Sequence, residues 1–157
     1  AYEIPKHDWS SDVCSSDLTY QDADLILRLY EMRREARMRE ARKWFAAHFK
    51  VKTMEEFGAT CPPGSEPNAS FRMLTTYWEM AASLVTSGVL DQELFFQNNR
   101  ELYFVYLRLR TLLPALRQAF ASSIDLKNLE TQAEAYAAWW ERQSPGAADA
   151  YAKRIGG

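Results

Sequence analysis

Few side chains in this 157-residue chain have the types and spacing that chemistry requires. Glu79 is the only acid between positions 68 and 87, and no second carboxylate lies three or four residues away to share acid–base work. Arg33 and Arg37 lie off the mixed-charge stripe of the preceding Arg-rich segment, and a partly buried arginine needs a bidentate acceptor. The sequence therefore predicts that Glu79 pairs with Arg33 or Arg37 and fixes the packing of the two helices. An acid–base site at Glu79 is the alternative.

Metal and nucleophile chemistry have weaker candidates. A di-iron centre in a helical bundle needs Glu-x-x-His on two helices, and the sequence has no such repeat. His48 stands alone near the end of a helical segment, and Cys61 precedes two prolines with neither a second thiol nor a paired histidine nearby. We therefore predict no catalytic residue, no metal ligand and no cofactor, and a protein that is not an enzyme.

Four aromatic residues are not all expected to fit on the apolar helix faces that form the main core. Adjacent helical residues point about 100° apart, so one of each neighbouring pair is expected outside the main core. The residues concerned are Phe95, Phe96, Tyr103 and Trp139. Exposed aromatic side chains of this kind favour contact with a protein partner or a second copy. Burial beneath a loop or the C-terminal tail is the alternative.

Positive charge gathers in residues 19–52, which hold nine Lys or Arg against five Asp or Glu. Arg34, Arg37, Arg42 and Lys43 are the candidates for contact with an anion or nucleic acid. The alternative is an ordinary solvated face, because charges of both signs alternate there and Glu35–Arg39 has the spacing of a helical ion pair.

A helical period runs through the chain from Thr19 onward, and no stretch alternates as a strand would. The pattern predicts an all-α helical bundle of about five to six helices. The expected helices span residues 19–49, 53–57, 68–87, 91–97, a segment from 102 that Pro114 kinks or replaces by a new helix, and one capped at Asp125, with an irregular loop at 58–67. Gly88 is expected to end the third helix and Asp91 to cap the fourth.

The helix at 68–87 is expected at the centre of the bundle, with both of its apolar faces covered by other helices. One face carries Phe71, Leu74, Trp78 and Val85, and the other carries Met73, Tyr77, Met80 and Leu84.

Composition is that of one soluble globular domain, with 47% hydrophobic residues and a net charge of −2. Such a charge disfavours general attraction to nucleic acid or to anionic membranes. No apolar run reaches the roughly 18 residues that a membrane span requires. One cysteine outside the N-terminal segment argues against a disulfide framework, so we expect a cytoplasmic protein.

Residues 8–18 differ from the rest of the chain. Ser-Ser-Asp-Val and Ser-Ser-Asp-Leu recur five residues apart without a helical or strand period, and the segment resembles a translated sequencing adaptor. We expect residues 1–18 to be a non-native leader that does not pack on the core, which excludes His7, Trp9 and Cys14 from the site. The expected organisation is then a bundle domain at 19–143 followed by a short helical tail at 144–157.

Three segments carry a family resemblance. They are Tyr77-Trp78-Glu79, the run from Gly88 to Leu94, and Leu109-Arg110 ahead of Pro114. The stretch from Thr19 to Asp24, followed by an Arg-rich helix, also looks like the start of such proteins. The chain resembles small helical proteins of unknown function from soil bacteria. The resemblance implies a helical bundle and transfers no activity.

The function that these observations favour is binding without catalysis. We expect a helical-bundle protein that acts by binding a protein partner or by forming a homo-oligomer. The alternative is a nucleic-acid accessory protein that uses the Arg-rich first helix.

Overall fold

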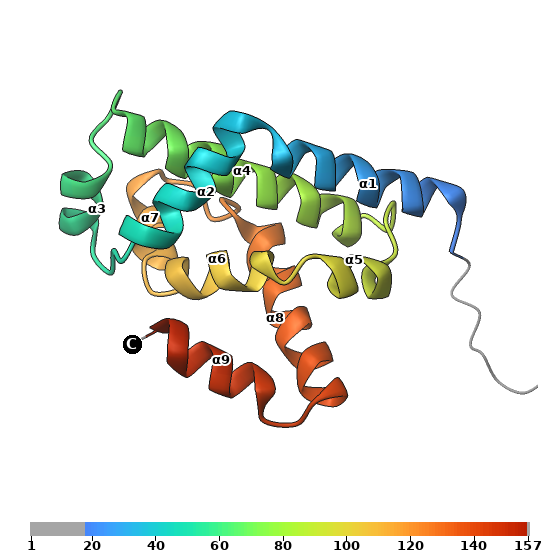
Figure 1. The fold of residues 1–157 in the computed structure, drawn as a ribbon. Coiled ribbons are helices and arrows are strands. Elements are labelled where there is room, and N and C mark those ends of the chain that lie inside the picture. Colours follow the sequence, from blue (N-terminus) through green and yellow to red (C-terminus); the bar gives the residue numbers. More distant parts are fainter. Residues whose placement is uncertain (1–17, 157) are drawn as a thin grey trace, which may run out of the picture.

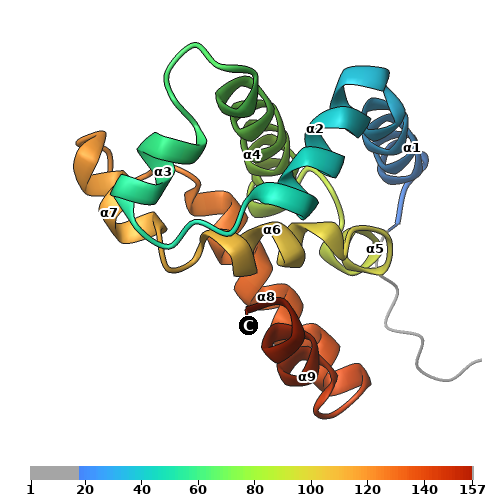
Figure 2. The same ribbon diagram turned by 60° about the vertical axis from the view of Figure 1, so that its left-hand side comes forward.

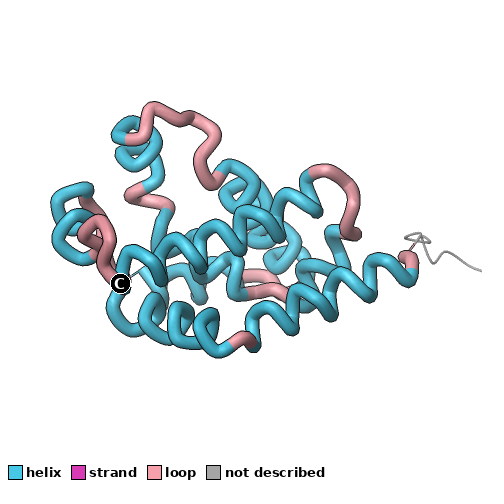
Figure 3. Tube along the Cα trace, turned by 90° about the horizontal axis from the view of Figure 1, so that it is seen from above, coloured by secondary structure: helices cyan, strands magenta, loops and turns pink. Residues whose placement is uncertain are grey.

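The computed structural model describes residues 18–156. Over that range it contains nine α-helices and no strand (Figures 1 and 3). The helices are α1 (Tyr20–Arg34), α2 (Ala36–His48), α3 (Met54–Thr60), α4 (Glu66–Thr86), α5 (Gln92–Asn98), α6 (Glu101–Leu109), α7 (Leu113–Ala119), α8 (Lys127–Gln143) and α9 (Ala147–Gly156). The all-α class is confirmed, with more helices than the five to six predicted.

Helix α4 is the central element, packed chiefly against α2 and α8 (Figure 1). Its first apolar face is fully covered, since Phe71, Leu74, Trp78 and Val85 are all buried. The second face is covered only in part: Tyr77 is buried, whereas Met80 is 36% exposed. The prediction of two covered faces is therefore wrong at Met80, because no helix packs over that part of α4.

The predicted single helix at 19–49 is two helices that break at Glu35. This residue adopts an extended conformation (ψ 141°), and its carboxylate accepts the backbone N–H of Met38 at 3.0 Å to cap α2. Arg42 donates to the carbonyl of Arg33, one of the last carbonyls of α1. The break turns α2 so that it packs on α4 (Figure 1).

Local sequence signals set most of the other helix ends. Thr19 with Asp22 and Thr53 with Glu56 form the two expected capping boxes. Gly88, at φ +71°, ends α4: its N–H donates to Val85 and the next N–H donates to Leu84, which is a Schellman motif. Pro114 starts α7 rather than kinking α6.

The predicted loop at 58–67 is shorter than expected. Helix α3 continues to Thr60 and α4 starts at Glu66, so that only five residues link them. The side chain of Ser65 caps α4 by accepting the backbone N–H of Asn68.

Asp125 does not cap α8, contrary to prediction. The residue before the helix is Leu126 in a left-handed conformation (φ 54°), while Asp125 accepts a hydrogen bond from the Ser122 hydroxyl. The first N–H groups of α8 are capped by a side chain from another helix, described below.

Helices α8 and α9 form a hairpin that covers one side of α6 (Figures 1 and 2). The expected tail is thus a ten-residue helix in contact with the bundle, and its Ala148 is buried. The contact is largely aromatic: the Tyr151 ring lies 6.0 Å from Tyr103 and 5.4 Å from Trp140.

The segment expected to be a non-native leader lies outside the described residues, apart from its last member, Leu18. The same holds for three residues of this segment, His7, Trp9 and Cys14. Among the helices that the structure does describe, none combines the length and apolarity that crossing a membrane would need.

Candidate binding groove

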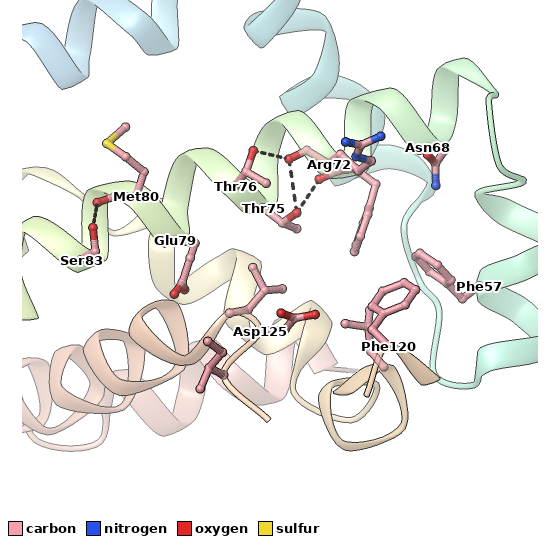
Figure 4. A pocket seen from close by; sticks show the side chains of 14 residues that line it. Phe57, Asn68, Arg72, Thr75, Thr76, Glu79, Met80, Ser83, Phe120 and Asp125 are labelled. Carbon is pink, nitrogen blue, oxygen red and sulfur yellow. Dashed lines mark hydrogen bonds between the residues drawn. The ribbon is translucent and has the colours of Figure 1, made fainter. Parts of the chain in front are cut away.

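A cavity of about 630 Å³ opens beside the incompletely covered face of α4. Its walls come from α4, from α7 with the link to α8, and from Phe57 of α3 (Figure 4). Its volume falls within the range of roughly 300–1,000 Å³ that is usual for ligand pockets. We call this cavity the α4–α7 groove.

The groove is apolar in its depth and at its rim. Phe57, Phe71 and Leu116 are buried and line it. Two large side chains at its edge are unusually open to solvent, Phe120 at 55% and Ile124 at 75%. Met80 lines the same cavity from α4. Exposed apolar groups that gather at one concavity are typical of an interaction site rather than of scattered surface residues.

The hydroxyl groups that line the groove bond to their own helix. Thr75 Oγ1 donates to the carbonyl of Phe71 at 2.9 Å, and Thr76 Oγ1 donates to the carbonyl of Arg72 at 2.6 Å (Figure 4). Ser83 likewise donates to the carbonyl of Met80. None of these hydroxyls lies against a base that would activate it, so their arrangement does not make a nucleophile.

Glu79 caps α8 across the groove and does not pair with an arginine. One carboxylate oxygen accepts the backbone N–H and the side-chain amide of Asn128 at 3.1 and 2.8 Å, and the other accepts the N–H of Leu129 at 2.8 Å. The predicted ion pair with Arg33 or Arg37 is therefore wrong. The helix N-terminus supplies the positive partial charge and the free donors that a second charged side chain would otherwise provide.

The acid that pairs with Arg33 is Glu101, at the start of α6. Glu101 accepts a bidentate contact from Arg42, at 2.8 Å from both Nε and Nη2, and lies 3.7 Å from Arg33. This pairing raises the pKa of Arg42 further above its usual range. The sequence did not indicate that Glu101 is the acid that binds these arginines, because Glu101 lies 59 residues beyond Arg42.

Tyr77 joins this cluster to α1. Its hydroxyl donates to the carbonyl of Leu29 at 2.9 Å. Burial raises the pKa of Tyr77 to about 12. The cluster of Arg33, Arg42, Glu101 and Tyr77 thus links α1, α2, α4 and α6, and none of its four residues lines the α4–α7 groove. We assign it a structural role.

The four aromatic residues predicted to face a partner belong to the core. Phe95, Phe96 and Tyr103 are buried and Trp139 is half-buried. The Phe96 ring lies 5.4 Å from Tyr136 and 5.8 Å from Trp139, which shows how α8 covers α5. The prediction was wrong because a second layer of helices covers the aromatic side chains that a single apolar helix face could not bury.

The four basic candidates do not share one site. Arg42 is held by Glu101, and the Arg34 guanidinium lies 5.5 Å from the ring of Tyr30. Arg37 lines a shallow hollow together with two acids, Glu40 and Glu66. Lys43 is exposed on α2. Acids thus lie beside Arg42 and Arg37, while Arg34 and Lys43 form no salt bridge with the described residues.

Neither Cys61 nor His48 is among the residues that line the groove. Cys61 is buried, and burial raises the pKa of its thiol to about 11. His48 is exposed at the end of α2. Within residues 18–156, no three or more His, Cys, Asp or Glu side chains gather in a way that could hold a metal ion.

Sequence reasoning did not find the groove. Phe120 and Ile124 lie between α7 and α8, where a polar link is the usual expectation. Three large apolar residues in a seven-residue link, Phe120, Ile124 and Leu126, were the available signal. Which side of α4 they face depends on how α7 folds back on the bundle.

Fold and groove together define a small all-α protein with an open apolar groove on its central helix. The chain belongs to the family described as Domain of unknown function (DUF4760), whose family model matches residues 18–139. That match runs from the start of α1 into α8 and ends before α9. No curated protein and no solved structure matches the chain.

Proposed function

We propose that this protein is a non-catalytic binding module whose α4–α7 groove takes an apolar segment of a protein partner. The observation that carries the proposal is the convergence of exposed Phe120, Ile124 and Met80 on one cavity. Insertion of a partner's apolar side chains would remove these groups from water and so stabilise the complex.

The polar groups of the groove also favour binding over catalysis. Glu79 already accepts three hydrogen bonds, and the threonine hydroxyls bond within α4. A general base must reach the proton that it removes, and these groups are committed to the fold. The proposal that the protein is not an enzyme rests on this commitment.

At the Arg72 end of the groove, charge favours an acidic residue in the partner segment, whereas Glu79 and Asp125, which also line the cavity, are bonded to the start of α8 and to Ser122. Arg72 lines the groove, is exposed, and makes no ion pair with any residue that the structure describes. A guanidinium beside an apolar wall suits a carboxylate that arrives with apolar neighbours. The occupant that we propose is therefore an amphipathic segment with apolar anchors and one acid at the Arg72 end.

We further propose that the protein acts in the cytoplasm, since buried Cys61 is a free thiol among residues 18–156. The nucleic-acid alternative has less support, because Arg42 is paired with Glu101 and Arg37 lies beside acids. It predicts retention on DNA at low salt that is lost in Arg34→Gln/Lys43→Gln.

A photo-crosslinking residue at position 120 tests the groove, with one at the exposed Leu27 of α1 as the matched control. We expect position 120 to capture a defined segment of one partner. A synthetic peptide of that segment should bind the protein in titration calorimetry. Ile124→Glu and Arg72→Glu should each weaken this binding by about tenfold or more.

Light scattering on the purified chain tests a second copy as the occupant, which would appear as a dimer that Ile124→Glu dissociates. Such a dimer would replace the proposed partner by self-association. A monomer from which position 120 captures no more than position 27 would overturn the proposal.

A further inference from the structure

A second concavity lies on another part of the molecule, where three distant segments meet. It has a volume of about 260 Å³. Its walls come from the link after α2, from the end of α6 with the link that follows, and from Ile155 of α9. None of its lining residues belongs to the α4–α7 groove.

Four cations line this hollow, and no acid does. They are Lys50, Lys52, Arg108 and Arg110. Not one of them forms a salt bridge with a carboxylate of residues 18–156. The chain as a whole carries a net charge of −2, so this concentration of one sign is local. Four like charges at one concavity repel one another and focus a positive field into it.

Arg108 also has an unused donor. Its Nε–H is buried and has no hydrogen-bond partner among the described residues. The guanidinium is held 5.6 Å from the ring of Phe104, which fixes its position. A buried donor without an acceptor costs stability, so a shift of the guanidinium that brings this N–H to an oxyanion in the hollow would recover that cost.

We propose that this hollow binds a phosphate group. Arg108 and Arg110 offer planar guanidinium groups that match the oxygens of a phosphoryl group, and the two lysines add mobile point charges. The exposed hydroxyl of Thr111 lies at the same wall and can donate to an oxygen. The volume is below the roughly 300 Å³ at which pockets for larger ligands begin. The recognised unit is therefore a single phosphoryl group, free in solution or on a lipid headgroup.

Helix dipoles do not reverse this preference. The hollow lies at the C-terminal end of α6 and beside the last turn of α9. Each helix end contributes about −0.5 of an elementary charge. Four formal positive charges outweigh two such ends together with the carboxylate of Glu56, which accepts the backbone N–H of Lys52, so the net field still attracts an anion.

Titration of the full chain with inorganic phosphate tests the site, at ionic strength matched with chloride. We expect saturable binding in calorimetry and a rise in the midpoint of thermal unfolding. Arg110→Gln changes an exposed residue and should fold normally, and Arg108→Gln removes the buried donor. Each should weaken phosphate binding by roughly tenfold or more.

Lys43→Gln is the matched control, because Lys43 is exposed on α2 and outside the hollow. A second arm uses vesicles of phosphatidylcholine with and without phosphatidic acid. Pelleting with phosphatidic acid that Arg110→Gln abolishes assigns the phosphoryl group to a lipid, while binding of phosphate alone assigns it to solution. Binding in neither arm, or binding that Lys43→Gln weakens as much as Arg110→Gln does, would overturn the proposal. Ile124→Glu should leave phosphate binding unchanged, so this result is independent of the groove.

Discussion

At the scale of single residues, the carboxylates of this protein hold helix ends as well as arginines. Glu79 caps α8 from α4, Glu35 caps α2, and Asp22 accepts the N–H of Asp91 at the start of α5 at 2.9 Å. The hydrogen bonds that Asp22 accepts from Thr19, Asp91 and the backbone of Thr19 lower its pKa. The contacts of Glu79 and Asp22 tie together segments that are remote in sequence.

Glu79→Ala should lower the free energy of unfolding by about 2 kcal/mol, because the N–H groups of Asn128 and Leu129 lose their acceptor. Urea denaturation followed by circular dichroism measures the change. Glu79→Gln keeps one acceptor oxygen and should lose less. The control is Glu31→Ala, an exposed position on α1, which should change stability by less than about 0.5 kcal/mol. Equal effects at the two positions would show that the cap is not needed.

Tyr77→Phe should cost about 1 kcal/mol at neutral pH, since the bond to the Leu29 carbonyl is lost. Burial raises the pKa of Tyr77 to about 12 in the folded protein, above its ordinary value of 10.0. Its contribution is therefore fully present below about pH 10 and is lost as the pH rises through about 12. Over that interval the wild type should lose about 2 kcal/mol more than Tyr77→Phe does. Parallel urea curves at alkaline pH for the two proteins would contradict this.

At the scale of helices, local signals place most ends but not the break at Glu35. Neither glycine nor proline lies near that residue. The break gives α2 its own direction, so that Met38, Ala41 and Phe45 are buried. Burial of those side chains offsets the lost helical hydrogen bonds, and this gain exists only when α4 is in place.

Gly88→Ala should destabilise the protein by about 1–2 kcal/mol, because Gly88 holds φ +71° at the end of α4. Gly58→Ala is the matched control within α3, where an added methyl group meets no atom within 4 Å. That substitution should be neutral or stabilising by up to about 1 kcal/mol. Thermal unfolding of both variants decides the matter. A Gly88→Ala protein as stable as Gly58→Ala would contradict the assigned Schellman motif.

At the scale of the whole molecule, α8 and α9 complete the core that α4 begins. The Arg100 guanidinium lies 5.5 Å from the ring of Trp140 and 6.0 Å from that of Tyr151, between the two helices of the hairpin. Tyr103, Tyr136 and Trp140 meet beneath α9. The aromatic residues that the sequence assigned to a partner thus pack against other residues of the same chain.

Tyr151→Ala should lower stability by about 1–2 kcal/mol and expose Tyr103 and Trp140, since two aromatic contacts are lost. Tryptophan fluorescence should shift to longer wavelength, and denaturant unfolding should give the energy. Tyr20→Ala is the control, because Tyr20 is 94% exposed and its ring packs on no core residue. Loss of stability only at Tyr20 would refute the role given to α9.

Several elements could be predicted because their signals are local. The capping boxes at Thr19 and Thr53, the cap at Asp91, the stop at Gly88 and the start at Pro114 each depend on bonds within a few residues. The buried face of α4 followed from the helical period of Phe71, Leu74 and Trp78. Both candidate sites were missed, because each combines segments that lie tens of residues apart.

The sequence by itself determined the all-α class, most helix ends and the central place of α4, since periodicity and capping act over one or two helical turns. Only the tertiary structure decided which acid meets which arginine, which aromatic side chains are buried and where cavities open. Those outcomes depend on the relative placement of helices, and a carboxylate such as Glu79 finds either an arginine or a helix end according to what packing brings to it.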